Sequence, residues 1–176
     1  GALKADFKHA ETMIEAVKRQ PLMMDYLHGA KQIIGWAELF DVNWKIKMDV
    51  FNGERIVDLK CVKDFEPMYK PEEGRMHFIT YWRYDLQGAV YQELVRLLTG
   101  KRFPFYILAA TKQDPPDVRL FRVDQADMDV QLDSLRRDLL DIDAIKKGKA
   151  IPERCDSCAW CRHSRVLTGA VGMELY

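Results

Sequence analysis

The chain lacks an excess of charge of either sign. Lys and Arg together number 27, as do Asp and Glu, so the formal net charge of the 176 residues is zero. Whole-chain electrostatics therefore do not favour a nucleic-acid partner, and any attraction for phosphate must come from local basic patches. The sequence also has no apolar run near the roughly 20 residues that span a bilayer. Because it shows no basic-then-apolar leader, we expect a cytoplasmic protein without a membrane partner.

The chain has four cysteines, and their distribution is uneven. Cys155, Cys158 and Cys161 fall within seven residues near the end of the sequence, whereas Cys61 stands alone. Three thiols this close together are typical of a metal site in a reducing compartment and argue against a disulfide framework.

The overall composition indicates a folded protein with a real core. Hydrophobic residues make up 48% of the chain and aromatic residues 11%, which excludes a largely disordered chain. At this length we expect a single globular domain. The chain begins with Gly1 in place of Met, and we therefore expect further sequence upstream.

Apolar spacing and turn residues predict an alternation of helices and strands. Apolar residues three and four apart indicate amphipathic helices, strict alternation indicates strands, and the continuous apolar run 104–111 indicates a buried central strand. Asn52-Gly53 is the strongest short hairpin signal in the chain. The order implies an α/β (α+β) fold in which helices flank a mixed sheet. Helices are expected at 4–19, 21–26, from Tyr84 to the stop at Gly100, and at 125–147; strands are expected at 31–39, 43–51, 55–61, 104–111 and 118–123.

One group of charged residues is predicted to meet on one face of the sheet. Asp58 and Lys60 are two apart on a strand and leave the same face, and Asp49 lies across the hairpin. Burying such charges is costly unless something uses them. Mg²⁺ suits this pair of carboxylates, and it can polarise a phosphate and activate water. A plain ion pair between Asp58 and Lys60 on a half-exposed strand is the alternative.

Further residues can extend this site. Lys60 can orient or help deprotonate a water, or stabilise charge on a phosphate. Lys45 and Lys47 share the Asp49 face and can contact a DNA backbone, or be ordinary solvated lysines. Gln87 and Tyr91 are one helical turn apart and share a face. There a Gln can contact a base or a metal-bound water, or both residues can simply pack.

The stretch WKIKMDVFNGERIVDLKC (44–61), followed by YWRYDLQGAVY (81–91), resembles a known family. It is similar to the PD-(D/E)XK nuclease domain of RecE-type exonucleases, phage-associated relatives of RecB and lambda exonuclease. The resemblance covers nearly the whole chain and implies a restriction-endonuclease-like αβββαβ core over 1–150, with a separate Cys-rich tail over 151–176. It implies metal ligation by Asp49, Asp58 and the backbone carbonyl of Leu59. Lys60 matches the second half-motif, and Gln87 and Tyr91 match the Q-x-x-x-Y signature of the RecB-like branch.

The sequence departs from the family pattern at three places. Met48 stands where the family usually has Pro before the first acid. The family's upstream His ligand is expected before Gly1 and is not transferred to His9. A further family acid falls near Gln32, whose amide is a poorer ligand, although Glu38 can substitute for it. These departures leave open whether the chain alone has a complete catalytic site.

The resemblance implies a Mg²⁺- or Mn²⁺-dependent exodeoxyribonuclease that acts on linear double-stranded DNA in phage-type recombination. A single-strand annealing recombinase is the expected partner, and rings among the relatives suggest a homo-oligomer by analogy. A catalytically impaired nuclease fold that binds DNA or a partner is the first alternative. A restriction-type endonuclease is the second, and it would differ by cutting closed circular DNA.

The cysteine tail has its own resemblance and its own alternatives. Three thiolates select zinc or an iron–sulfur cluster. Several RecB-like nucleases, AddB among them, hold a [4Fe–4S] cluster on three C-terminal cysteines and one upstream cysteine, and Cys155, Cys158 and Cys161 are similar. His163 can complete a zinc site instead. Cys61 is a less favourable fourth ligand, because it is expected to point into the core. Arg154, Arg162 and Arg165 can bind phosphate or offset the thiolate charge.

Overall fold

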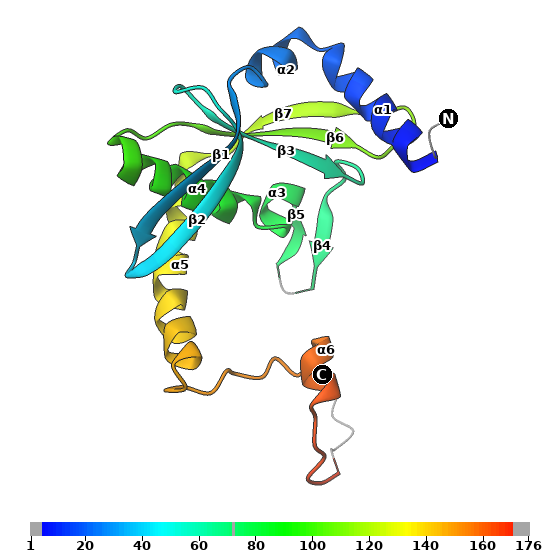
Figure 1. Cartoon of the computed structure of the whole chain (residues 1–176). Helices are drawn as coiled ribbons and strands as arrows, with labels where there is room; N and C mark the ends of the chain where they lie inside the picture. Colours follow the sequence, from blue (N-terminus) through cyan, green and yellow to red (C-terminus); the bar gives the residue numbers. More distant parts are fainter. Residues whose placement is uncertain (1–4, 72, 171–176) are drawn as a thin grey trace. The chain divides into compact units, whose positions relative to one another are not determined.

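The computed structural model describes residues 5–71 and 73–170, and Figure 1 gives the order of its elements. Most predicted elements form within one or two residues of the expected bounds. The helices are α1 (Ala5–Lys18), α2 (Pro21–Tyr26), α3 (Phe78–Tyr81), α4 (Tyr84–Thr99), α5 (Gln125–Lys146) and α6 (Ala159–His163). The strands are β1 (Ala30–Leu39), β2 (Val42–Phe51), β3 (Ile56–Val62), β4 (Met68–Lys70), β5 (Gly74–Met76), β6 (Phe105–Thr111) and β7 (Val118–Arg122).

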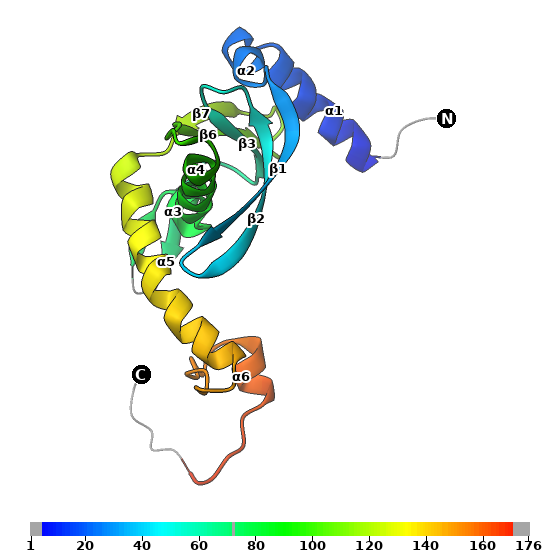
Figure 2. The ribbon, with the colours of Figure 1, turned by 60° about the vertical axis from the view of Figure 1, so that its left-hand side comes forward.

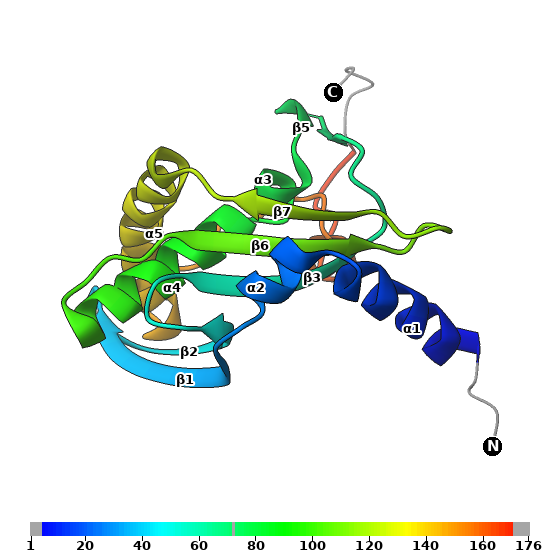
Figure 3. The ribbon, with the colours of Figure 1, turned by 90° about the horizontal axis from the view of Figure 1, so that it is seen from above.

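A five-stranded mixed sheet forms the centre of the fold, as predicted. Its strand order is β1-β2-β3-β6-β7. Strands β3 and β6 run parallel, whereas the other neighbouring pairs are antiparallel. The chain between β3 and β6 contains α4, which makes the crossover that a parallel pair requires. Figure 3 shows β3 and β6 side by side in the middle of the sheet.

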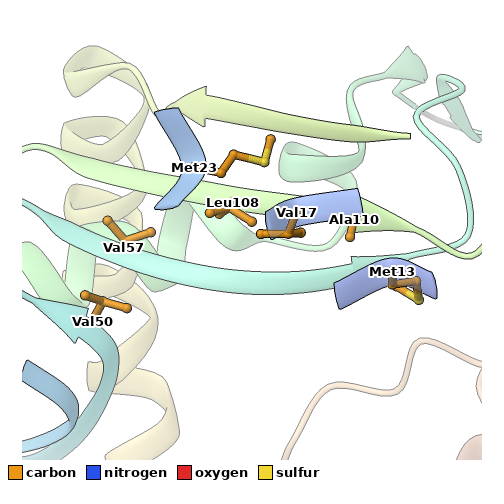
Figure 4. Close-up of a cluster of buried hydrophobic side chains, with 7 residues drawn as sticks. All are labelled: Met13, Val17, Met23, Val50, Val57, Leu108 and Ala110. Atoms are coloured by element: carbon orange, nitrogen blue, oxygen red, sulfur yellow. The ribbon is translucent and has the colours of Figure 1, made fainter. Parts of the chain in front are cut away.

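Helices cover both faces of this sheet. Helices α1 and α2 lie over one face and α4 over the other (Figures 1 and 2). A cluster of buried apolar side chains forms under α1 and α2 (Figure 4), and it draws on two helices and three strands. Burial of apolar area is the main favourable term in folding, so this cluster ties the two helices to the sheet. Its members are Met13, Val17, Met23, Val50, Val57, Leu108 and Ala110.

The β2–β3 hairpin is confirmed, and its pairing is short. The Asn52 side-chain oxygen accepts hydrogen bonds from the backbone N–H groups of Glu54 and Arg55, both at 3.0 Å. Gly53 has φ +83°, which a residue without Cβ adopts at little cost. Only Val50↔Val57 and Phe51↔Ile56 are paired between the strands. Beyond these pairs the two strands separate, and the C-terminal half of β3 loses its cover on the β2 side.

One expectation about β3 is wrong for this reason. Cys61 is exposed, although its position opposite Lys60 in the alternation predicted a core residue. Leu59, on the same side of the strand, is 45% exposed. Helices α1 and α2 cover Val57 but leave both residues accessible, because β2 no longer runs beside them.

Four short elements were not predicted from the sequence. The stretch with Pro67 and Pro71 contains two of them, the strands of the small β4–β5 sheet. Helix α3 is a single turn after it, and α6 is a single turn in the cysteine tail. Elements of three to five residues are too short to show a periodic pattern.

By its contacts the chain divides between Arg137 and Asp138 into two compact units. The first contains the sheet, and the second contains the cysteine tail. Among the residues with described positions, none of the helices is both long and apolar enough to cross a membrane.

Helix α4 packs unusually close to the sheet at Gly88. A Cβ at this position would lie 2.5 Å from the ring of Phe105, which is fully buried. Overpacking of this kind costs about 1–3 kcal/mol, and it should exceed the gain of about 1 kcal/mol that Ala has over Gly in a helix. Gly88→Ala should therefore lower the free energy of unfolding in urea denaturation.

The space around Gly88 can be tested separately from its helix propensity. Gly88→Ala should cost less when Phe105→Leu is already present, because the smaller side chain leaves room for the methyl group. Gly169→Ala is the control, since a Cβ there meets no atom of the described residues within 4 Å. Equal costs in both backgrounds would contradict the steric explanation.

Candidate active site

Asp49 stands where the β2–β3 ladder ends. Continuing the Val50↔Val57 register by one residue sets Asp49 opposite Asp58, but the strands have separated there. The Oδ2 atom of Asp49 instead accepts a hydrogen bond from the backbone N–H of Leu59 at 2.9 Å. Its Oδ1 atom accepts one from the Gln32 amide at 2.8 Å. Asp49 is therefore held beside β3 with both oxygens engaged.

Asp58 is the buried member of the carboxylate pair and is only 3% exposed. Its Oδ1 atom accepts a hydrogen bond from the Gln87 amide on α4 at 2.8 Å. Its Oδ2 atom lies 2.6 Å from the Lys60 ammonium. That approach is an ion pair, and no hydrogen-bond partner of this buried oxygen is found among the described residues. A buried oxygen in this condition is costly unless a positive charge faces it.

Burial raises the pKa of the Asp58 carboxyl above its ordinary value. The nearby Lys60 ammonium acts in the opposite direction, as does the Gln87 amide. The charge of Asp49 raises the pKa further, which shows that the two carboxylates lie close enough to repel each other. A cation placed between them would relieve this repulsion.

Lys60 is held between a carboxylate and an aromatic ring. Its Nζ atom pairs with Asp58 on one side and lies 4.5 Å from the centroid of the Tyr84 ring on the other. A ring face attracts an ammonium group most strongly where water is excluded, and the Lys60 side chain is 19% exposed. The ammonium is thereby fixed at the mouth of the site, with some access to solvent.

Gln87 and Tyr91 reach the strands from the same face of α4, as their spacing predicted, but they act at different points. Gln87 binds the Asp58 carboxylate directly. The Tyr91 hydroxyl donates a 3.0 Å hydrogen bond to the backbone carbonyl of Lys47, two residues before Asp49. Gln87 therefore orients one acid, and Tyr91 anchors the strand that carries the other.

The remaining predicted residues surround this centre. Lys45 and Lys47 are exposed on β2, and the Lys45 ammonium lies 4.8 Å from the centroid of the Trp36 ring. Gln32, at the position of the expected third acid, has φ +55° and turns its amide to Asp49. Glu38 pairs in register with Asn43, at the other end of β1 from Gln32. It is therefore not positioned to substitute for the missing acid.

These residues fit a divalent cation. Hard cations take carboxylate and carbonyl oxygens, and the buried Oδ2 of Asp58 lacks a hydrogen bond. In an extended strand the N–H and C=O of one residue point to the same side. Because the Leu59 N–H points to the β2 side of β3, the Leu59 carbonyl points to that side as well. Asp49, Asp58 and this carbonyl form the predicted ligand set.

The three tail cysteines also come together. The sulfur atoms of Cys155, Cys158 and Cys161 lie within 4.8 Å of one another. Backbone N–H groups of Cys158 and Cys161 each donate to the preceding cysteine sulfur at 3.4 Å. The Ser157 hydroxyl and nearby N–H groups lower the pKa of Cys155 to about 6, which favours the thiolate. His163, the alternative zinc ligand, does not belong to this group of potential ligands in the described part of the chain.

Residues 1–164 match the family described as a PDDEXK-like domain of unknown function (DUF3799). The chain belongs to this family. The PDDEXK-like domain is also similar to the crystal structure of a "Putative exonuclease" from Eubacterium rectale, with 42% sequence identity and a TM-score of 0.87. The match covers 98% of this chain but 65% of the Eubacterium rectale chain. The comparison with curated proteins found no match.

Two residues of the PDDEXK-like domain were missed by the sequence analysis. Tyr84 contacts the Lys60 ammonium, but an aromatic residue at a helix start carries no specific signal. The Gln32 amide was considered only as a weak ligand, whereas it donates to Asp49 across β1 and β2. Its spacing from Asp49 along the chain could suggest that contact only once the register of the two strands was known.

A divalent cation that binds this site should stabilise the folded PDDEXK-like domain. Binding at 100 times Kd adds roughly 2.7 kcal/mol, so Mn²⁺ should raise the Tm measured by differential scanning fluorimetry. Asp58→Asn should lose this increase. Because burial raises the pKa of Asp58, the increase should diminish as the pH falls through that pKa and the carboxylate takes up a proton.

Asp133→Asn supplies the control for this measurement, since Asp133 is an exposed carboxylate on α5. Its Tm should rise with Mn²⁺ as much as that of the unaltered protein. A full Mn²⁺-dependent increase in Asp58→Asn would contradict the assignment of Asp58 as a ligand.

Proposed function

We propose that this PDDEXK-like domain is the catalytic part of a Mg²⁺- or Mn²⁺-dependent exonuclease that hydrolyses phosphodiester bonds of linear DNA. The observation that carries the proposal is the buried Asp58 carboxylate, which meets Lys60 on one side and the charge of Asp49 on another. Two acids and a lysine that come together at a largely buried position of a nuclease fold are typical of a catalytic site. The family match and the Eubacterium rectale structure support the same class of reaction.

Each residue of the site has a distinct role in this proposal. Asp49, Asp58 and the Leu59 carbonyl hold the cation, which when bound supplies positive charge to the scissile phosphate. The Lys60 ammonium donates hydrogen bonds to phosphate oxygens and stabilises the negative charge that develops when water adds to phosphorus. Gln87 and Tyr91 are positioning residues, because each contacts the strands that carry the acids.

The proposed substrate, biological role and partner rest on the resemblance to RecE-type exonucleases. Attack at the ends of linear double-stranded DNA, a role in phage-type recombination and a single-strand annealing partner are what RecE-type relatives imply. Assembly into a homo-oligomer is a proposal of the same kind. The PDDEXK-like domain matches 65% of the Eubacterium rectale chain. The rest of that chain can contribute to the substrate choice of the Eubacterium rectale protein.

A second candidate function is a DNA- or partner-binding module with impaired catalysis. The specific observation that favours it is Gln32, an amide where the family resemblance expects an acid. An amide oxygen is a neutral ligand and binds a divalent cation less strongly than a carboxylate. DNA binding without hydrolysis under any divalent metal would support this candidate over the first.

The catalytic proposal predicts metal-dependent loss of linear DNA. Purified protein should degrade linear duplex DNA with Mg²⁺ or Mn²⁺ and leave closed circular DNA intact, as followed by gel electrophoresis. Lys60→Ala should lower the rate by about 100-fold or more, since one charge-stabilising donor is typically worth this much. Lys18→Ala, an exposed lysine on α1, should retain the full rate.

Each alternative gives a different pattern in this assay. Cleavage of closed circles would favour the restriction-type endonuclease. Equal rates for Lys60→Ala and Lys18→Ala would reject Lys60 as a catalytic residue.

We also propose that Cys155, Cys158 and Cys161 hold zinc or a [4Fe–4S] cluster in the intact protein. Such centres need a fourth ligand as a rule, and the resemblance to AddB-like nucleases assigns it to a cysteine upstream of Gly1. The clustered sulfur atoms and the lowered pKa of Cys155 support thiolate ligation.

The cysteine proposal predicts a stoichiometric metal that depends on the cluster. Protein purified without oxygen should contain zinc or iron by elemental analysis, and iron should be accompanied by visible absorption. Cys155→Ser should lose the metal, whereas Cys61→Ser should keep it, because Cys61 belongs to the first unit and is not one of the three clustered thiols. Metal content unaffected by Cys155→Ser would refute the assignment.

A further inference from the structure

A groove opens beside the candidate active site within the first unit. It lies between the end of β3, the start of β4 and the junction of α3 with α4, and its volume is about 580 Å³. Ligand pockets for small molecules typically measure about 300–1,000 Å³. The groove is therefore large enough for one nucleobase with its sugar. Its lining includes Cys61, Val62, Met68, Phe78, Trp82 and Tyr84.

An exposed indole stands at this groove. Trp82 is 54% exposed, although a large aromatic side chain usually finds cover in a monomer. Its backbone is fixed, because its N–H donates to the Phe78 carbonyl at 3.0 Å. The ring packs edge-to-face against Tyr81, with the centroids 5.0 Å apart. The indole is thus held in position by the fold while much of its aromatic surface remains exposed.

Tyr84 makes the groove continuous with the candidate active site. The same ring lines the groove and faces the Lys60 ammonium at 4.5 Å. Between Trp82 and Tyr84, Arg83 adopts φ +58°, a conformation that non-glycine residues rarely take. This turn ends α3 and starts α4, so it sets the two aromatic side chains on either side of a fixed corner. A molecule in the groove would lie next to the group proposed to stabilise phosphate charge.

The charges around the groove favour an uncharged aromatic ligand over a phosphate. Lys63 is paired with Asp64 at 3.4 Å, and Glu66 adds a further negative charge to the lining. A phosphate placed there would meet more acid than base. A nucleobase instead offers a neutral π-face, and stacking on aromatic side chains is how proteins commonly hold unpaired bases.

We infer that the groove between β3 and the α3–α4 corner binds an unpaired nucleobase of the DNA substrate by stacking on Trp82, next to the phosphate that faces Lys60. The inference rests on the proposed function, since it places the base relative to the proposed site of hydrolysis. It extends that function by assigning a base-binding subsite, which implies that at least one terminal nucleotide is unpaired when the strand is engaged.

Photo-crosslinking tests this subsite without requiring turnover. A short duplex with a single-stranded overhang carries 5-iododeoxyuridine at successive positions, and it is irradiated with the full chain in EDTA. Mass spectrometry should map the crosslink to Trp82 or Tyr84 for one or two adjacent positions. A crosslink that maps only outside the groove would overturn the inference.

Affinity measurements complete the test. Trp82→Leu should bind the overhang duplex roughly 5- to 100-fold more weakly, as expected for the loss of one stacked base, and Trp82→Phe should restore most of the affinity. A substrate that is abasic at the crosslinking position should be insensitive to Trp82→Leu. Phe7→Leu, which alters an exposed aromatic residue on α1, is the matched control and should bind like the unaltered protein.

The outcomes separate this inference from the proposed function. Hydrolysis of linear DNA together with unchanged binding by Trp82→Leu would overturn the subsite alone, and it would favour an apolar peptide segment as the occupant of the groove. Crosslinking at Trp82 by a protein that never hydrolyses DNA would support the subsite and reject the exonuclease.

Discussion

The structure depends on how a charged pair is kept inside a sheet. Asp58 is buried, one of its oxygens has no hydrogen bond, and the Lys60 ammonium is the positive charge that faces it. Such a pair gains little stability over apolar residues of the same size. A functional role for the charge accounts for the pair, and the nearby Asp49 carboxylate fits the proposed binding of a cation.

Helix α4 is the element that makes this arrangement possible. It lies close to β6 at Gly88, where no side chain larger than hydrogen fits against Phe105. From this distance the Gln87 amide reaches the Asp58 carboxylate, and the Tyr91 hydroxyl reaches the backbone of β2. Residues within two turns of this helix therefore pack closely against the sheet, orient an acid and anchor a strand.

The separation of β2 from β3 after two paired positions also shapes the candidate site. It frees the Leu59 N–H from the ladder, and Asp49 accepts it. The same separation exposes Leu59 and Cys61. An opening in the sheet thus admits solvent to the edge of the carboxylate pair while Asp58 itself stays covered. Both conditions, a carboxylate shielded from water and an accessible edge, suit the proposed binding of a cation and a phosphate.

The sequence by itself determined the long elements and the identity of the charged residues. Alternation and the Asn52-Gly53 turn specify the hairpin, and Asp58-x-Lys60 must share a face because strands alternate with period two. Only the tertiary structure decided what each residue contacts. The exposure of Cys61, the Gln32 amide on Asp49 and the Tyr84 ring beside Lys60 depend on where strands separate and how close a helix packs. Those distances arise from contacts between distant segments, which no local pattern encodes.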